Sequence, residues 1–136
     1  MPPKILVDTD ILSYYLKGYP DVLQSLDEHE KQHGAVFISR ITVVEILGGL
    51  KAKNATAQEA RLREFLKTRT VLEIDEATGE IAANIFAHLY QTGRHSGNYD
   101  IFIAATALQY QLTLCTNNLK DYRHVPGLEV VNWRKG

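Results

Sequence analysis

The chain has 136 residues, 45% of them hydrophobic, and a formal net charge of −1. This length fits one domain with a sizeable core, so we expect residues 1–136 to form a single domain. The near-zero charge excludes a strongly basic or acidic protein, although a local patch can still bind nucleic acid. Cys115 is the only cysteine, which excludes an internal disulfide. No apolar run reaches bilayer length and no secretory signal is visible, so we expect a cytoplasmic location and no membrane partner.

The first third of the chain predicts two buried strands, each leading into a helix. Residues 4–7 are apolar and end at polar residues, as in a short buried strand, and a helix is expected over 10–17. The segment "DVLQSLDEHEKQ" predicts a solvated amphipathic helix capped by Asp21. "AVFIS" is the second buried strand, and Ser39 is the expected N-cap of the helix that follows.

The middle of the chain continues this pattern. The helix in "RITVVEILGGL" contains β-branched residues, which are poor helix formers, and the Gly48–Gly49 pair should end it. A polar helix is expected at 54–68, followed by a strand in "TVLEI". Asp75 or Thr78 should then open a helix through "GEIAANIFAHLYQ".

The last third adds one helix and two strands. An Ala-rich helix, "DIFIAATALQYQ", has Asn98 as its candidate N-cap. The strand "LTLC", the loop "TNNLKDYRHVPG" and a final strand, "LEVVNW", follow it. Strands and helices therefore alternate along the whole chain. This alternation predicts the α/β class: a three-layer α/β/α arrangement around a central, mostly parallel sheet of about five strands.

Acidic residues stand at matching ends of these units. Asp8 and Asp10 follow the first strand, and Glu45 lies in the helix after the second. Asp100 is in the first turn of the helix that precedes the fourth strand, and Asp121 follows that strand. Because ligands bind where the carboxyl ends of parallel strands meet, we expect these carboxylates to gather there. Asp100 joins them if its crossover helix starts at that edge.

Several carboxylates in one cleft repel each other unless a cation lies among them. A pair about 4 Å apart costs about 4 kcal/mol at an effective dielectric constant near 20. Oxygen-only ligands suit Mg²⁺ or Mn²⁺, and such an ion can activate water and stabilise charge on a phosphate. Each acid also has a structural alternative, because an acid can simply cap a helix or stand in its first turn, as could Asp8, Asp10 and Asp100.

Three segments together resemble a known family. "ILVDTDILSYYL" is similar to an opening motif of an apolar strand followed by Asp-Thr-Asn, and "ISRITVVEILGGL" to a second motif containing Glu-Leu and a Gly. "NYDIFIAATALQYQLTLCTNNLKDYRHVPGLEVVNW" is similar to the third motif and the tail. The sequence therefore resembles PIN-domain ribonucleases, specifically VapC-type toxins of type II toxin–antitoxin systems, over nearly the whole chain.

The resemblance implies a set of catalytic acids. It implies metal-binding carboxylates at Asp8, Glu45 and Asp100, with Mg²⁺ as the expected ion and Mn²⁺ as the alternative. The fourth family acid corresponds to Asp121, although some members carry it at the place of Asn118.

Other polar residues near these acids complete the expected site. Asp10 stands where the family usually has Asn, so it adds a charge or merely caps the helix. Thr116 matches a small hydroxyl residue that the family often has near the scissile phosphate. Because an acidic site repels phosphate, flanking cations must compensate, and the candidates are Arg40, Lys51, Lys53 and Arg94.

The expected activity is endoribonucleolytic: a water activated by the metal would attack an RNA phosphodiester. Asp8 and Asp100 would be direct ligands, whereas Glu45 and Asp121 would ligate through water or orient the nucleophile. The substrate is expected to be single-stranded or loop RNA. The resemblance further implies a homodimer and a cognate VapB-type antitoxin that blocks the site.

Two other readings fit part of the sequence. "VDTDIL" matches the start of a haloacid-dehalogenase-like phosphatase, in which Asp8 would be the nucleophile, but the tail lacks the late acid pair that this family needs. A non-catalytic receiver-like or partner-binding module would also collect acids at this edge. Such a module needs a lysine after the last strands, for which Lys120 is a weak candidate.

Overall fold

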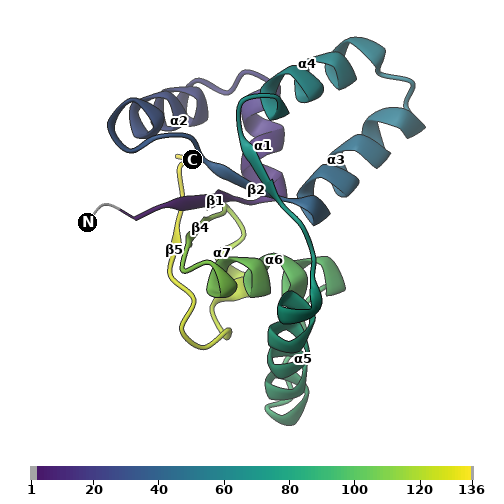
Figure 1. Ribbon diagram of the computed structural model, residues 1–136, viewed down its shortest axis with the longest axis vertical. Helices are drawn as coiled ribbons and strands as arrows, with labels where there is room; N and C mark the ends of the chain where they lie inside the picture. The colour runs from purple at the N-terminus through teal and green to yellow at the C-terminus, as the bar shows by residue number, and fades with distance from the viewer. Residues whose placement is uncertain (1–2, 136) are drawn as a thin grey trace.

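The computed structural model describes residues 3–135, which fold around one parallel sheet (Figure 1). Within that range the sheet has five strands in the order β3-β2-β1-β4-β5, and every neighbouring pair is parallel. The strands are β1 (Ile5–Val7), β2 (Phe37–Ser39), β3 (Thr70–Leu72), β4 (Thr113–Cys115) and β5 (Val130–Val131). The predicted parallel α/β sheet is confirmed.

Helices cover both faces of the sheet, as Figure 1 shows. One layer consists of α1 (Thr9–Leu16), α2 (Pro20–His33), α3 (Arg40–Ala52) and α4 (Thr56–Leu66). The opposite layer consists of α5 (Glu76–Gln91), α6 (Asn98–Gln109) and the short α7 (Leu119–Tyr122). The three-layer arrangement is therefore as predicted.

Strand β1 lies at the centre of the sheet and contributes to both hydrophobic cores. Leu6 packs with the core under α5 and α6, whereas Ile5 and Val7 pack with the core under α1, α2 and α4. Successive side chains of a strand point to opposite faces, so a central strand covered on both sides must be apolar throughout. This explains why the first strand is a continuous apolar run with no alternation.

The strand order reverses beside β1, because the chain goes from β1 to β2 on one side and later returns to β4 on the other. In open α/β sheets such a reversal leaves a crevice beyond the carboxyl ends of the strands, and ligands bind there. Here the reversal falls between β1 and β4, whose last residues, Val7 and Cys115, are partners in the register.

The predicted end of the helix after the second strand is wrong. Helix α3 runs through Gly48 and Gly49 to Ala52. Each glycine costs about 1 kcal/mol relative to alanine, but Leu47 and Leu50 of the same helix pack against the core and offset this.

Caps also differ from expectation at two helices, while two others are confirmed. Helix α2 starts at Pro20, which suits the first helical position, so Asp21 is inside the helix and not its cap. Helix α6 is capped by Gly97 and not by Asn98. Ser39 caps α3 through the Ile41 amide, and Asp75 caps α5 in a capping box with Thr78.

No helix within residues 3–135 is both long enough and apolar enough to cross a membrane.

Candidate active site at the carboxyl edge of the sheet

Asp8 directly follows β1, its amide donates to the carbonyl of Cys115 at the end of β4, and it is 4% exposed. It is the N-cap of α1, and its Oδ1 accepts a hydrogen bond from the Thr9 amide at 2.8 Å. Its Oδ2 accepts from the Thr116 hydroxyl, also at 2.8 Å. Burial raises the pKa of Asp8, and the charge of Glu45 raises it further, while the bonds from Thr116, Thr9 and Tyr122 act in the opposite direction. Asp8 is therefore both a helix cap and a buried acid at the carboxyl edge of the sheet, where the strand order reverses.

Asp10 lies one residue further along, in the first turn of α1, and joins this helix to the loop after β4. Its Oδ1 accepts from the Ile11 amide at 2.7 Å and its Oδ2 from the Asn117 amide at 3.0 Å. Burial, followed by the nearby Asp8 charge, raises the pKa of Asp10 from 3.8 to about 6. Asp10 is thus part of the same electrostatic site as Asp8 and does not cap the helix.

Asp100 comes from the first turn of α6 and reaches the site as expected. Its Oδ1 accepts a hydrogen bond from the Tyr122 hydroxyl at 3.1 Å. Its pKa is raised by burial and by the charges of Asp8 and Asp121. Tyr122 is 1% exposed, and burial beside Asp8 and Asp100 raises its own pKa, so the phenol keeps its proton and remains a donor.

Glu45 lies on α3 and is linked to the start of α1 by a hydrogen bond from the Thr9 hydroxyl. Its Oε1 accepts from the Thr9 hydroxyl at 2.8 Å, and Thr9 also lies 3.1 Å from the hydroxyl of Thr42. Glu45 is half-buried, and its charge contributes to the raised pKa of Asp8. Glu45 is therefore close enough to Asp8 to act on it electrostatically and is linked to the start of α1 through Thr9.

The two candidates for the fourth acidic position lie together. The Asn118 side-chain amide donates to Asp121 Oδ2, and the Asn118 backbone amide donates to the Thr116 hydroxyl at 2.9 Å. The charge of Asp121 contributes to the raised pKa of Asp100. Asp121 is thus within electrostatic range of Asp100, and Asn118 fixes its orientation.

A match over most of the chain decides the family. The PIN domain family model matches residues 5–128. The chain belongs to the PIN domain family. This confirms the resemblance found in the sequence and leaves the phosphatase and receiver-like readings of this PIN domain without support.

Curated relatives of this PIN domain are VapC proteins. Ribonuclease VapC2 of Haemophilus influenzae is 33% identical over 131 residues, which cover 96% of this chain and 98% of that protein. The tRNA(fMet)-specific endonuclease VapC of Shigella flexneri is 28% identical over the same shares of the two chains. The chain is therefore a VapC-type PIN domain.

Solved VapBC structures share its fold. The structure of VapBC2 from Rickettsia felis, bound to a DNA fragment from their promoter, superposes with a TM-score of 0.87 at 26% identity. That likeness covers 96% of this chain and 98% of the other. DNA-bound VapBC from Salmonella typhimurium gives a TM-score of 0.86 at 27% identity, covering 98% of this chain and all of the other.

The donor set of this PIN domain fits a hard divalent cation held by few protein ligands. No three Asp, Glu, His or Cys side chains between residues 3 and 135 converge closely enough to surround an ion directly. Asp8 and Asp100 were expected as direct ligands and Glu45 as a ligand through water, and one Glu45 oxygen is engaged by the Thr9 hydroxyl. Mg²⁺ usually keeps several waters and takes only one or two carboxylates, a requirement that Asp8 and Asp100 meet. Burial and neighbouring negative charge raise the pKa values of Asp8 and Asp100. A bound cation would favour the ionised form of both carboxylates and so oppose these two effects.

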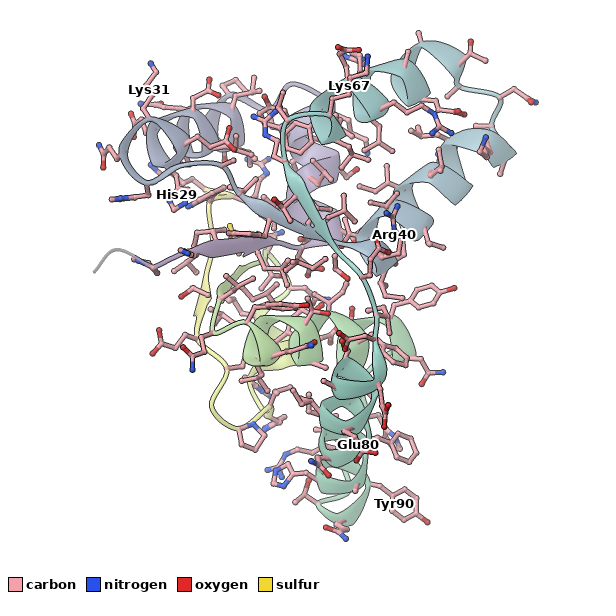
Figure 2. All side chains as sticks on the ribbon, viewed as in Figure 1. His29, Lys31, Arg40, Lys67, Glu80 and Tyr90 are labelled. Carbon is pink, nitrogen blue, oxygen red and sulfur yellow. The ribbon has the colours of Figure 1, made fainter. Side chains whose placement is uncertain are left out.

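Arg40, expected beside the substrate, is already engaged by an acid. Its guanidinium makes two hydrogen bonds to Glu73, at 2.8 and 2.6 Å. Figure 2 shows Arg40 at the start of α3. Lys51 similarly pairs with Glu59 at 3.4 Å. Both pairs are exposed and therefore weak, so an RNA phosphate could compete for either cation.

Sequence reasoning missed two residues of this PIN-domain site, Tyr122 and Thr9. Tyr122 follows the predicted fourth acid directly in "NLKDY", and a large aromatic residue in a polar loop is a signal that could have indicated a buried role. Thr9 was read only as part of the opening motif. Its link to Glu45 spans 36 positions, and nothing local in the sequence indicates it.

Proposed function

We propose that this VapC-type PIN domain is the toxin of a toxin–antitoxin pair and a Mg²⁺- or Mn²⁺-dependent endoribonuclease. The observation that carries the proposal is the convergence of Asp8, Asp10 and Asp100 at the carboxyl edge, where burial and mutual repulsion raise their pKa values. Charged groups in that position are expensive without a counter-ion, and a site of this kind is a functional-site candidate on physical grounds alone.

Asp8 and Asp100 would hold the ion, each kept in place by a hydroxyl donor. Thr116 donates to Asp8, and Tyr122 donates to Asp100. When bound, the ion supplies water of lowered pKa and charge stabilisation at the phosphate. Hydroxyl donors of this type orient ligating carboxylates, and their loss typically costs about 10- to 100-fold in affinity or activity.

Glu45 and Asp121 would orient the attacking water and accept its proton. Thr9 fixes one Glu45 oxygen, which leaves the other oxygen available to the crevice. Asn118 fixes Asp121 in the same way. The Thr116 hydroxyl donates to Asp8 and accepts from the Asn118 amide. Thr116 would therefore affect the reaction by orienting Asp8 and not by contacting the substrate.

The substrate would be RNA with an unpaired backbone, which can enter an acidic crevice flanked by cations. Arg94 and Arg123 are the cations we assign to its phosphates. The pKa of His124 is lowered first by burial and then by the charges of Arg94 and Arg123, so both arginines lie near it. Among residues 3–135, neither arginine forms an ion pair with an acid. The endonuclease of Shigella flexneri is named as specific for tRNA(fMet), and a tRNA is the corresponding class of substrate here.

The partner would be a VapB-type antitoxin, since solved structures similar to this chain are VapBC complexes. A second copy of this chain would complete the assembly. Phe86 and Tyr90 of α5 are each more than half exposed, and their rings stack on each other. Exposed apolar side chains that lie together mark an interaction surface.

Sequencing of RNA ends in cells that express the chain tests the proposed activity. Wild-type protein is expected to generate new RNA ends, whereas Asp8→Asn should generate at least about 100-fold fewer, because the variant loses a charged ligand. The purified protein should cleave the same RNA with Mg²⁺ or Mn²⁺ and not with EDTA, and co-expression of the cognate antitoxin should suppress cleavage. Equal cleavage by Asp8→Asn and wild type would overturn the proposed mechanism.

A further inference from the structure

The segment that follows β5, residues 132–135, is fastened to α2, and we call it the tail. Arg134 Nη1 donates to Asp21 Oδ2 at 2.7 Å, and the Lys135 amide donates to the same oxygen at 2.7 Å. The Arg134 guanidinium lies 4.8 Å from the centre of the Tyr19 ring. Figure 1 shows the yellow segment after β5 running up to α2, away from the end of the sheet at which α3 begins. An ion pair that is mostly buried and stacked on an aromatic ring fixes this tail more firmly than an exposed pair would.

The fastened tail is hydrogen-bonded to the loop that follows β4. The Arg134 amide donates to Asn132 Oδ1 at 2.9 Å, and Asn132 Nδ2 donates to Asn117 Oδ1 at 2.9 Å. The side-chain amide of Asn117 also reaches the Tyr14 hydroxyl, at a longer 3.4 Å. An exposed loop side chain is therefore connected to α2 through two residues of the tail.

This loop is the segment that contacts both Asp8 and Asp10. The Asn117 amide donates to Asp10 Oδ2, and the Thr116 hydroxyl donates to Asp8 Oδ2. The Thr116 amide in turn donates to the carbonyl of Val131 in β5 at 2.9 Å. The acids are thus held on one side by residues 116–118, and that loop is held on its outer side by β5 and the tail.

We infer that Asn132 and Arg134 are positioning residues of the acidic site: tethered to α2, they hold Asn117 and so fix the loop that orients Asp8 and Asp10. These two residues lie beyond residue 128, where the PIN-domain match ends. The effect on metal binding and cleavage rests on the proposed function, whereas the effect on the loop does not.

Hydrogen exchange of the Asn117 amide in the metal-free full chain tests the tether itself. Asn117 is exposed, so its amide should be protected only while the bond to Asp10 is maintained. Asn132→Ala and Arg134→Ala should each speed its exchange about 10-fold and leave exchange in β1 and α6 unchanged. Asn84→Ala, which removes an exposed asparagine of α5 outside the network, is the matched control and should change neither. Unchanged Asn117 exchange in Asn132→Ala and Arg134→Ala would overturn the inference.

Mn²⁺ binding and cleavage kinetics test the consequence for the site. Both tail variants should bind Mn²⁺ about 10-fold more weakly than wild type and Asn84→Ala. They should also lower kcat with little change in the KM for RNA, because the tail orients acids and does not bind the substrate. If Asn117 exchanges faster in the tail variants but their Mn²⁺ affinity and kcat equal those of the wild type, the tail holds the loop without positioning the acids. That result would contradict the inference. Absence of Mn²⁺ binding in the wild type would instead contradict the proposed function, and the exchange result would still decide whether the tail holds the loop.

Discussion

At the scale of single residues, the site is a set of acids whose ionised forms are stabilised by hydrogen bonds from nearby amides and hydroxyls. Asp8 and Asp10 each accept two hydrogen bonds, and Asp100 accepts one from Tyr122. The acids could be predicted from the sequence because each follows a recognisable strand or opens a recognisable helix. Their donors could not, because a threonine or tyrosine is common everywhere and only its position in the fold makes it specific.

Asp10→Asn is expected to stabilise the metal-free protein at pH 7.5. A pKa raised from 3.8 to about 6 corresponds to a cost of about 3 kcal/mol once the group is ionised. The asparagine removes that cost but loses one acceptor, worth about 1 kcal/mol, so the free energy of unfolding should rise by about 1–2 kcal/mol. Urea denaturation of both proteins in EDTA measures the difference.

The pH dependence of this difference identifies Asp10 as its origin. A carboxyl with a raised pKa binds its proton more tightly in the folded state, so its contribution to stability is complete below pH 3.8 and is lost as the pH rises through about 6. The advantage of Asp10→Asn should therefore shrink steadily between pH 7 and pH 4. A difference that stays constant over this range would contradict the assignment.

At the scale of elements, hydrogen bonds at helix ends fix the position of α6, which carries Asp100, relative to α5. Helix α5 is closed at its start by a capping box in which Asp75 and Thr78 each bind the other's backbone amide. Gln109, at the end of α6, donates to Asp75 at 3.1 Å and accepts from Thr78. The two helices are thus joined at the end of α6 that is opposite Asp100.

Asp75→Ala is expected to lower the free energy of unfolding by about 1–2 kcal/mol, the usual cost of losing an N-cap. Cleavage should stay within about twofold of wild type, because the cap lies at the other end of α6 from the acidic site. Chemical denaturation and RNA cleavage measure the two effects. Glu76→Ala, one residue later and exposed, is the control and should be nearly neutral; an equal loss in both variants would argue against a specific cap.

At the scale of the whole molecule, one surface remains apolar after the core has formed. Tyr90 is 75% exposed and Phe86 56% exposed, and their rings stack 6.4 Å apart on α5. Figure 2 shows Tyr90 pointing away from the rest of the molecule at the free end of that helix. A hollow of about 260 Å³ with an almost entirely apolar lining lies beside Phe86, between α5 and α6. A second copy of the chain is the partner we expect there.

Phe86→Asp is expected to convert a homodimer into a monomer. A charge in the middle of an apolar interface is left unpaired and desolvated, which typically costs more than 2 kcal/mol of association free energy. Light scattering coupled to size exclusion measures the mass of each species, and circular dichroism verifies that the variant is folded. Ala83→Asp, which also places a charge in the hollow, should have the same effect, whereas Glu64→Ala on α4 should not. A wild type that is monomeric at micromolar concentration would rule out this surface as a homodimer interface.

The sequence by itself determined the class of fold, the parallel sheet and the position of Asp8, Asp10, Asp100 and Asp121 at its carboxyl edge. These features depend on local patterns, because a buried strand, a cap and a helix each extend over only a few neighbouring residues. Its errors were local too: α3 continued through Gly48 and Gly49, because contacts with the core outweighed intrinsic propensity.

Only the tertiary structure decided which groups hold those acids. The Thr116–Asp8 bond spans 108 positions, the Asn117–Asp10 bond 107 and the Arg134–Asp21 bond 113. Such contacts arise only when the sheet brings β1, β4 and the tail side by side, and they depend on angles and separations that no periodicity in the sequence specifies. The same holds for Arg40, whose charge was evident in the sequence but whose partner, Glu73, depends on the pairing of β2 with β3.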